Sequence, residues 1–170
     1  FHDPMAAIGV VPQLVKAGID PTSIEYMDNP NVRTTSEYLE FPGAPHVEDG
    51  IYVIITIGTF NEDELDMKME QASDICEAAG AVDVLEADER IWSMRRNCLE
   101  SVSLISKVCT TDDVVVPVDE MSDMIQYIIK TVAKYPFPLR INAHIGDGNL
   151  HIVLCKLDLS DEEWEAELSR

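Results

Sequence analysis

Two histidines near the C-terminal end of the sequence are the residues best placed to do chemistry. The segment His-Ile-Gly-Asp-Gly-Asn-Leu-His occupies residues 144–151, between two apolar runs. Asp147-Gly148 at its centre predicts a two-residue hairpin turn of type I′, which needs positive φ at both positions. Centred there, the turn would place His144 directly opposite His151, with Cβ atoms about 4.5–5.5 Å apart. Two imidazoles in that arrangement can bind one metal ion.

The alternation of side chains along the first strand of this hairpin predicts a face that carries chemistry. In an extended strand, successive side chains point to opposite faces of the sheet. Over this strand, Ile141, Ala143 and Ile145 fall on one face, and Arg140, Asn142 and His144 fall on the other. The same pattern also fits a structural role, in which hydrogen bonds satisfy each ring. A metal site would need at least one more ligand, usually a carboxylate or a third histidine, and no neighbouring residue supplies it.

The hairpin needs a sheet and helices to hold it, and the apolar periodicity predicts both. Short β-branched or apolar runs predict strands at residues 22–27, 51–59, 82–85, 114–116, 139–145 and 150–155. Apolar residues at helical spacing predict helices at residues 5–18, 62–79, 88–107 and 119–134. The continuous run at 51–59 predicts a buried strand, and Thr59 is expected to cap the helix that follows. Residues 29–50 are rich in proline and glycine, which predicts a loop with at most one helical turn.

The order of these elements predicts the fold class. A hairpin close to the end of the chain, with helices between the other strands, favours a largely antiparallel sheet. We therefore expect a ferredoxin-like α+β fold in which the helices pack on one face of the sheet.

Composition and charge restrict the classes of protein to which the chain can belong. Its 170 residues suit one domain, and 46% of them are hydrophobic, enough for a sizeable core. The formal net charge of −20 argues against nucleic acid or an anionic membrane as a partner. No apolar run is long enough for a transmembrane segment. The four cysteines are widely spaced, which indicates free thiols and a cytoplasmic protein, with peripheral membrane attachment of a full-length enzyme left open.

Both ends of the sequence suggest a piece of a larger protein. The chain begins at Phe1, and Ser-Asp-Glu-Glu at residues 160–163 has the pattern of a capping box that opens a helix. Only a few residues follow this box before the chain stops at Arg170. We therefore expect residues 1–170 to be a fragment that is truncated at its C-terminal end.

Several motifs of the sequence occur together in one known family. They are His-Ile-Gly-Asp-Gly-Asn-Leu-His at 144–151, Asp-Asp-Val-Val-Val-Pro at 112–117, Ile-Trp-Ser-Met-Arg at 91–95 and Pro-Thr-Ser-Ile-Glu-Tyr-Met-Asp at 21–28. In this combination they resemble the C-terminal domain of the FAD-linked oxidases. That family includes D-lactate dehydrogenases, the D subunit of glycolate oxidase and D-2-hydroxyglutarate dehydrogenase. The resemblance extends from about residue 5 to residue 157.

The resemblance implies a two-domain flavoenzyme of which this chain is the substrate-side cap. FAD would be bound mainly by an N-terminal domain that residues 1–170 lack. Hydride would pass from C2 of a small 2-hydroxy acid to the FAD, and an electron-acceptor protein or a quinone would reoxidise it. His144 and His151 would bind a divalent metal (zinc, iron or manganese), completed by a glutamate beyond the chain. Arg95 would bind the substrate carboxylate and act in catalysis with the two histidines, while Asn149 would approach both flavin and substrate.

Two positions narrow the substrate that the resemblance implies. The hydroxyglutarate branch of the family has a lysine where this chain has Thr111, and an asparagine where it has Val153. Both differences remove polar groups suited to a second carboxylate. The resemblance therefore implies a small monocarboxylate, D-lactate or glycolate.

Two other interpretations stay open on the sequence alone. The chain could be a stand-alone ferredoxin-like domain that binds a small molecule or regulates a partner without catalysis. It could also be a metal-dependent hydrolase that uses the two histidines, although no third ligand is evident. Without the resemblance, Arg95 would be interpreted as a surface cation near Asp88 or Glu100.

Overall fold

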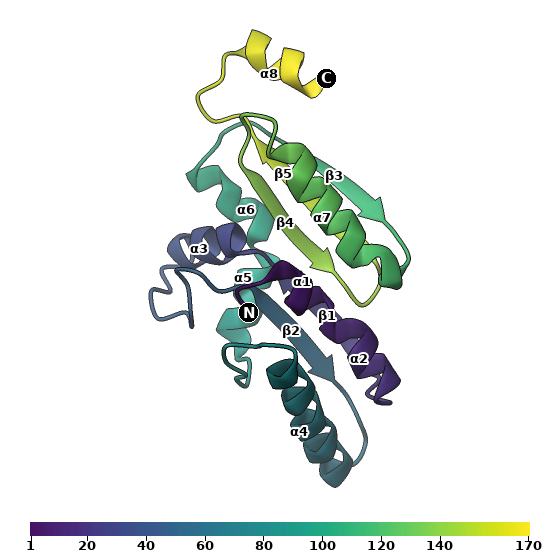
Figure 1. Ribbon diagram of the computed structural model, residues 1–170. Helices are drawn as coiled ribbons and strands as arrows, with labels where there is room; N and C mark the ends of the chain where they lie inside the picture. Colours follow the sequence, from purple (N-terminus) through teal and green to yellow (C-terminus); the bar gives the residue numbers. More distant parts are fainter.

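One antiparallel sheet organises the chain (Figure 1). The computed structural model describes residues 1–170, and its five strands lie in the order β2-β1-β4-β5-β3. Every pairing between neighbouring strands is antiparallel. The strands are β1 (Pro21–Met27), β2 (Tyr52–Ile57), β3 (Cys109–Val115), β4 (Leu139–His144) and β5 (Asn149–Cys155). The expected α+β class with a largely antiparallel sheet is confirmed.

Helices connect the strands and cover the sheet. They are α1 (Pro4–Ile8), α2 (Val10–Lys16), α3 (Asn29–Tyr38), α4 (Glu62–Ala78), α5 (Glu89–Arg96), α6 (Cys98–Ser101), η1 (Val102–Leu104), η2 (Val118–Glu120), α7 (Met121–Val132) and α8 (Asp161–Leu168). None of them is both long and apolar enough to cross a membrane. A core of 19 buried residues joins one face of the sheet to α1, α2, α4 and α7. In Figure 1, α7 runs alongside β4 and β5, and α4 lies at the β2 edge.

A smaller apolar cluster covers part of the opposite face. It consists of Met27, Val32, Ala44, Ile54, Met94 and Cys98. Met27 points away from Tyr26, a member of the larger core, because adjacent residues of a strand alternate between faces. The helices α3, α5 and α6 therefore pack on the side of Met27. Helices therefore lie on both faces of the sheet, whereas the sequence predicted helices on one face only. Helix α5 of this second set carries Arg95.

Helix α3 corrects the prediction of a loop over residues 29–50. Asp28 caps this helix, because its Oδ1 accepts a hydrogen bond from the backbone N–H of Asn31 at 2.9 Å. Pro30 lies in the first turn, where the missing N–H has no partner within the helix anyway. Proline in this segment therefore favours the start of a helix.

Strand β2 is an edge strand, and the prediction of a buried strand is wrong. It pairs only with β1, and Ile54 alone among its residues is buried. Residues 82–85, also predicted as a strand, form none. An apolar run does not by itself distinguish a central strand from a partly covered edge.

Two predicted helices are interrupted. Residues 5–18 form α1 and α2, which are separated at Gly9. Residues 88–107 are divided among α5, α6 and η1, with Asn97 between the first two. The side-chain amide of Asn97 donates to the carbonyl of Ser93 at 2.8 Å, so it binds the end of α5. Apolar spacing alone did not indicate this break.

The predicted cap of α8 is confirmed, and the predicted cap of α4 is wrong. Helix α8 has the predicted capping box between Ser160 and Glu163. Helix α4 is capped by Asn61, whose side chain accepts from the backbone N–H of Glu64 at 3.3 Å, and not by Thr59. Thr59 instead donates its hydroxyl to the Glu64 carboxylate at 3.0 Å.

Candidate functional site

The β4–β5 hairpin brings the two motif histidines to one face of the sheet, in a different register from the one predicted. The turn has four residues, 145–148, and the strand pairs are His144 with Asn149 and Asn142 with His151. The predicted direct opposition of His144 and His151 is therefore wrong. The two histidines are diagonal neighbours instead. They share a face because paired residues point the same way, and so do residues two apart in one strand.

Neighbouring strands explain the wider turn. Gly148 has a φ of 77°, and its carbonyl accepts a hydrogen bond from the backbone N–H of Val116 at 3.0 Å. A Cβ at this position would lie 2.0 Å from the carbonyl oxygen of Val116, so only glycine fits. On the other side, the N–H of Gly146 donates to the carbonyl of Ile24 at 3.3 Å. Gly148 is therefore required because the turn packs against Val116, and not because the turn has two residues.

The two imidazole rings lie against each other at the surface. Their centroids are 5.1 Å apart, and their planes make an angle of 86°. The side chain of His144 is 41% exposed and that of His151 is 27% exposed. A small molecule or an ion can therefore reach the pair.

Each histidine is held by a carboxylate from a flanking strand. Nδ1 of His144 lies 2.9 Å from Oε1 of Glu25, its partner across β1 and β4. Nδ1 of His151 lies 2.6 Å from Oδ1 of Asp113, its partner across β3 and β5. A carboxylate at Nδ1 favours the tautomer with the proton on that nitrogen, which leaves a lone pair on Nε2. Both rings thus present Nε2 as the atom that can bind a cation or accept a proton.

Glu25 also binds Arg95, so that one buried carboxylate connects Arg95 with His144. Nε of Arg95 donates to Oε2 of Glu25 at 2.9 Å. Nη2 lies 2.9 Å from the same oxygen as an ion pair. The side chains of Arg95 and Glu25 are only 12% and 8% exposed. The interpretation of Arg95 as a surface cation near Asp88 or Glu100 is therefore wrong.

Helix α5 carries Arg95 to the sheet. Asp88 caps this helix, and its Oδ1 accepts from the backbone N–H of Arg90 at 2.9 Å. Met94 is fully buried in the cluster that contains Met27 of β1. Positions two apart in a strand share a face, so the packing of α5 at Met27 brings the next helical residue, Arg95, beside Glu25.

Two buried polar atoms at this site have no hydrogen-bond partner. They are Nη2 of Arg95, whose contact with Glu25 does not have the geometry of a hydrogen bond, and Oδ1 of Asn149. A buried polar atom without a partner costs about 1–3 kcal/mol. Asn149 shares a face with its cross-strand partner His144. The predicted site residues are thus brought to one side of the sheet.

The two Nε2 atoms can supply two ligands to a divalent metal. The carboxylate at each Nδ1 matches the way proteins support metal-bound histidines. In residues 1–170, however, no group of three His, Cys, Asp or Glu side chains is arranged to hold a metal ion. The donor set fits part of a metal site and does not complete one.

Asp28, which the sequence did not single out, holds the end of β1 beside the site. Its Oδ2 accepts a hydrogen bond from the backbone N–H of Ile141 at 2.6 Å, while Oδ1 caps α3. Burial raises the pKa of Asp28 to about 7, although hydrogen bonds from Asn31 and Ile141 and the charge of Arg140 act in the opposite direction. The protonation of this carboxyl therefore changes near neutral pH.

Sequence reasoning also missed Glu25 and Asp113. Glu25 is a single acidic residue within Ile-Glu-Tyr-Met, the buried part of β1, and that isolation was a usable signal. Asp113 follows Asp112, and nothing local indicates which of the two carboxylates would face His151. Only the strand register selects Asp113.

Fold and site together define an α+β domain whose sheet presents a polar face at the hairpin of β4 and β5. Comparison with known families takes the identification further. Residues 1–169 match the family model described as FAD linked oxidases, C-terminal domain. The chain belongs to this family, and the resemblance inferred from the motifs is confirmed.

Curated relatives agree with this family. A D-lactate dehydrogenase of Anaerostipes hadrus is 30% identical over 171 residues, which cover 95% of this chain and 36% of that protein. The glycolate oxidase subunit GlcD of Bacillus subtilis (strain 168) is 29% identical over 163 residues, which cover 93% of this chain and 34% of that protein. The chain thus spans about a third of the length of these relatives.

Solved structures with the same fold are more distant in sequence. Two structures of alkyldihydroxyacetonephosphate synthase superpose with TM-scores of 0.67 and 0.65, over 99% of this chain and 37% and 36% of theirs. Their sequence identities are 14% and 13%, so they support the fold alone.

Proposed function

We propose that this chain is the substrate-side cap of a flavin-dependent dehydrogenase or oxidase that acts on a small D-2-hydroxy acid, D-lactate or glycolate. One observation carries the proposal: the buried carboxylate of Glu25 holds Arg95 and also contacts His144, beside a second histidine that presents Nε2. A guanidinium is suited to bind a carboxylate through two parallel hydrogen bonds. Membership of the FAD-linked oxidase family and a relative named D-lactate dehydrogenase support it.

Each residue of the site has a role in this proposal. Arg95 binds the carboxylate of the substrate, and Glu25 fixes the orientation of its guanidinium. Asn149, which shares a face with His144, contacts the substrate or the flavin. Nε2 of His144 or His151 accepts the proton of the 2-hydroxyl group. FAD, bound mainly by a domain outside residues 1–170, supplies the acceptor for the hydride from C2.

We also propose His144 and His151 as ligands of a divalent metal through their Nε2 atoms. Zinc, iron and manganese all accept imidazole together with carboxylate ligands. The missing ligand would come from outside residues 1–170. A metal bound there would lower the pKa of the 2-hydroxyl group and so ease its loss of a proton.

The preference for a monocarboxylate rests on Thr111 and Val153. The two positions lie 42 residues apart in the sequence, and they are direct cross-strand partners in β3 and β5. They form the next pair on the same face after Asp113 and His151. Val153 is buried and offers no polar atom to a second carboxylate of a longer substrate.

The partners and the compartment follow from the same proposal. The flavin would be reoxidised by an electron-acceptor protein or a quinone, and the cap would work against its own FAD-binding domain. All four cysteines are unpaired, which supports a reducing compartment such as the cytoplasm.

The test is an anaerobic visible spectrum of the full-length protein before and after addition of D-lactate or glycolate. We expect a bound flavin that is bleached. Arg95→Lys should raise KM about 10-fold or more, because the paired hydrogen bonds to a carboxylate are lost. Arg96→Lys is the matched control, since the adjacent Arg96 is exposed and pairs with Glu89. A full-length protein without flavin would instead favour a binding domain without catalysis.

A further inference from the structure

Two cysteines face each other at the end of the β3–β5 ladder. Cys109 of β3 and Cys155 of β5 are direct partners in the antiparallel register. Both are free thiols, with Cys109 exposed and Cys155 buried. No sequence pattern indicates the pair, because the two residues lie far apart in the chain and in no cysteine motif.

The backbone hydrogen bonds of the β3–β5 ladder show whether the two cysteines form a hydrogen-bonded or a non-hydrogen-bonded pair. The N–H of Val116 donates to the carbonyl of Gly148, and the N–H of Lys156 donates to the carbonyl of Val108, both at 3.0 Å. Hydrogen-bonded and non-hydrogen-bonded pairs alternate along an antiparallel ladder. The Val108 and Lys156 positions are hydrogen-bonded, so the adjacent cysteine pair is not.

Non-hydrogen-bonded pairs have the spacing that a disulfide requires. Their Cα atoms are about 4.5 Å apart and their side chains approach each other on one face. A disulfide spans Cα separations of about 4.4–6.8 Å. Asp113 and His151 form the same kind of pair in the same ladder, and their side chains are in contact at 2.6 Å. The β3–β5 ladder thus brings such side chains together.

A buried cation lies at the inner thiol. Arg140 is 5% exposed, and its Nε has no hydrogen-bond partner. Burial raises the pKa of the Cys155 thiol above its ordinary value, and the charge of Arg140 acts in the opposite direction. A guanidinium at a thiol favours the thiolate, which is the reactive form. Arg140 is therefore placed to stabilise the thiolate of Cys155 as it reacts.

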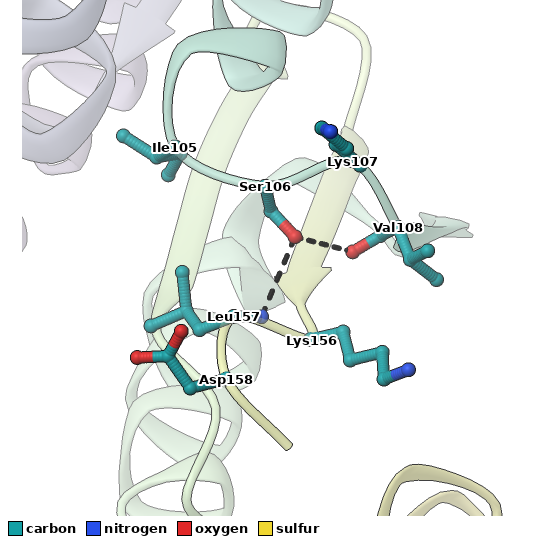
Figure 2. Close-up of a pocket in the computed structure, with 7 residues that line it drawn as sticks. All are labelled: Ile105, Ser106, Lys107, Val108, Lys156, Leu157 and Asp158. Carbon is teal, nitrogen blue, oxygen red and sulfur yellow. Dashed lines mark hydrogen bonds between the residues drawn. The ribbon is translucent and has the colours of Figure 1, made fainter. Parts of the chain in front are cut away.

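A pocket lies at the end of the ladder, beside the residues that adjoin the two cysteines. It has a volume of about 410 Å³. Figure 2 shows the residues that line it, which are Ile105, Ser106, Lys107, Val108, Lys156, Leu157 and Asp158. The hydroxyl of Ser106 donates to the carbonyl of Val108 at 2.6 Å and accepts from the N–H of Leu157 at 3.4 Å (Figure 2). These bonds connect the two chain segments that adjoin the cysteines.

We propose that Cys109 and Cys155 are a redox modification site, at which hydrogen peroxide oxidises the two thiols to a cross-strand disulfide. The thiolate of the exposed Cys109 attacks the O–O bond, which breaks to give a sulfenic acid on Cys109 and one water after protonation. The thiolate of Cys155 then attacks Sγ of Cys109, the S–S bond forms, and the sulfenic oxygen leaves as a second water. The two thiols lose two electrons and two protons in total, and the peroxide gains both. A dithiol reductant reverses the reaction by thiol–disulfide exchange.

The bond would join the edge strand β3 covalently to β5. These two strands carry Asp113 and His151. Oxidation would therefore fix the outer edge of the sheet on the side of the site, independently of which substrate the enzyme uses.

Peptide mapping of the full-length protein tests the proposal. The protein is treated with hydrogen peroxide, its remaining thiols are alkylated, and it is cleaved with trypsin. Each cysteine of this chain falls in a separate tryptic peptide, and those of interest are 108–130 and 141–156. We expect these two peptides to appear linked, with a combined mass lower by two hydrogens, and to separate on reduction.

Variants make the result specific. Cys109→Ser, at an exposed edge position, should abolish the linked peptide, and Cys155→Ala should do the same if its burial permits folding. Cys76→Ala is the control and should leave the link intact, since Cys76 lies in another part of the core. The proposal is overturned if peroxide leaves both peptides separate in the wild type, converts Cys109 only to higher oxides, or links it to a different cysteine.

Discussion

Replacement of Glu25 by glutamine should damage both the stability and the chemistry of the site, for separable reasons. Glu25 is buried, and its carboxylate contacts Arg95 through Oε2 and Nδ1 of His144 through both oxygens. Glu25→Gln keeps the shape of the side chain and one acceptor for Arg95, but it removes the charge that compensates a buried guanidinium. Loss of one partner of a buried ion pair costs about 3–5 kcal/mol. We expect the lower end of this range, about 3 kcal/mol, because one acceptor remains.

The effect on chemistry comes from the histidine tautomer. If the amide NH₂ of the glutamine faces Nδ1 of His144, that nitrogen must accept a hydrogen bond, and the proton of the ring moves to Nε2. The lone pair that could bind a metal or accept a proton is then lost. Replacement of a carboxylate that supports a functional histidine typically lowers metal affinity or activity about 10–100-fold.

Urea unfolding and steady-state kinetics of the full-length protein separate these two effects. Glu37→Gln is the control, because Glu37 is exposed on α3 and its substitution should change the free energy of unfolding by less than about 0.5 kcal/mol. If Glu25→Gln were as stable and as active as the control variant, the argument that Glu25 holds Arg95 and His144 would be refuted.

Three further predictions test other parts of the structure. His144→Ala and His151→Ala should each lower bound metal and activity together in the full-length protein, as measured by elemental analysis and turnover; full metal occupancy in both would exclude them as ligands. Gly148→Ala should destabilise the fold by about 1–3 kcal/mol, because φ is 77° and the new Cβ would meet the carbonyl of Val116; an unchanged thermal midpoint would contradict the turn geometry. Asp28 has a pKa of about 7 in the folded protein against 3.8 ordinarily, so the folded state holds this proton more tightly than the unfolded chain does. Its contribution to stability should be complete below about pH 4 and decline by up to about 1.4 kcal/mol per pH unit as the pH rises to about 7. Urea titrations at several pH values should show this slope in the wild type and not in Asp28→Asn.

The parts of the fold that the sequence predicts well are those with local signals. The two strands of the hairpin follow from alternation, and the capping box at Ser160 follows from its own side chains. The prediction that both histidines share a face is correct although the predicted register is wrong. The observed pairing is shifted by two residues, and an even shift keeps each side chain on the same face. Helix α3 has Asp28 as its cap and Pro30 in its first turn, which are both helix-start signals; the proline content of residues 29–50 predicts a loop only if the position of Pro30 is ignored.

The parts that escape prediction depend on contacts between distant segments. The pairing of His144 with Glu25 joins residues that are 119 positions apart. It requires β4 to lie beside β1, and no local pattern indicates that order of strands. The same holds for Cys109 and Cys155, whose proximity follows only from the register of β3 with β5.

The supply of both carboxylates by flanking strands has a consequence for how such a site can change. The hairpin carries the two histidines, but Glu25 and Asp113 reach them from strands on either side, across 119 and 38 positions of sequence. A hairpin moved alone to another sheet would keep the motif and lose the groups that set its tautomers. Positions 25 and 144, and likewise 113 and 151, should therefore vary together among relatives, and a relative that keeps the histidines without an acid at either partner position should bind and react differently.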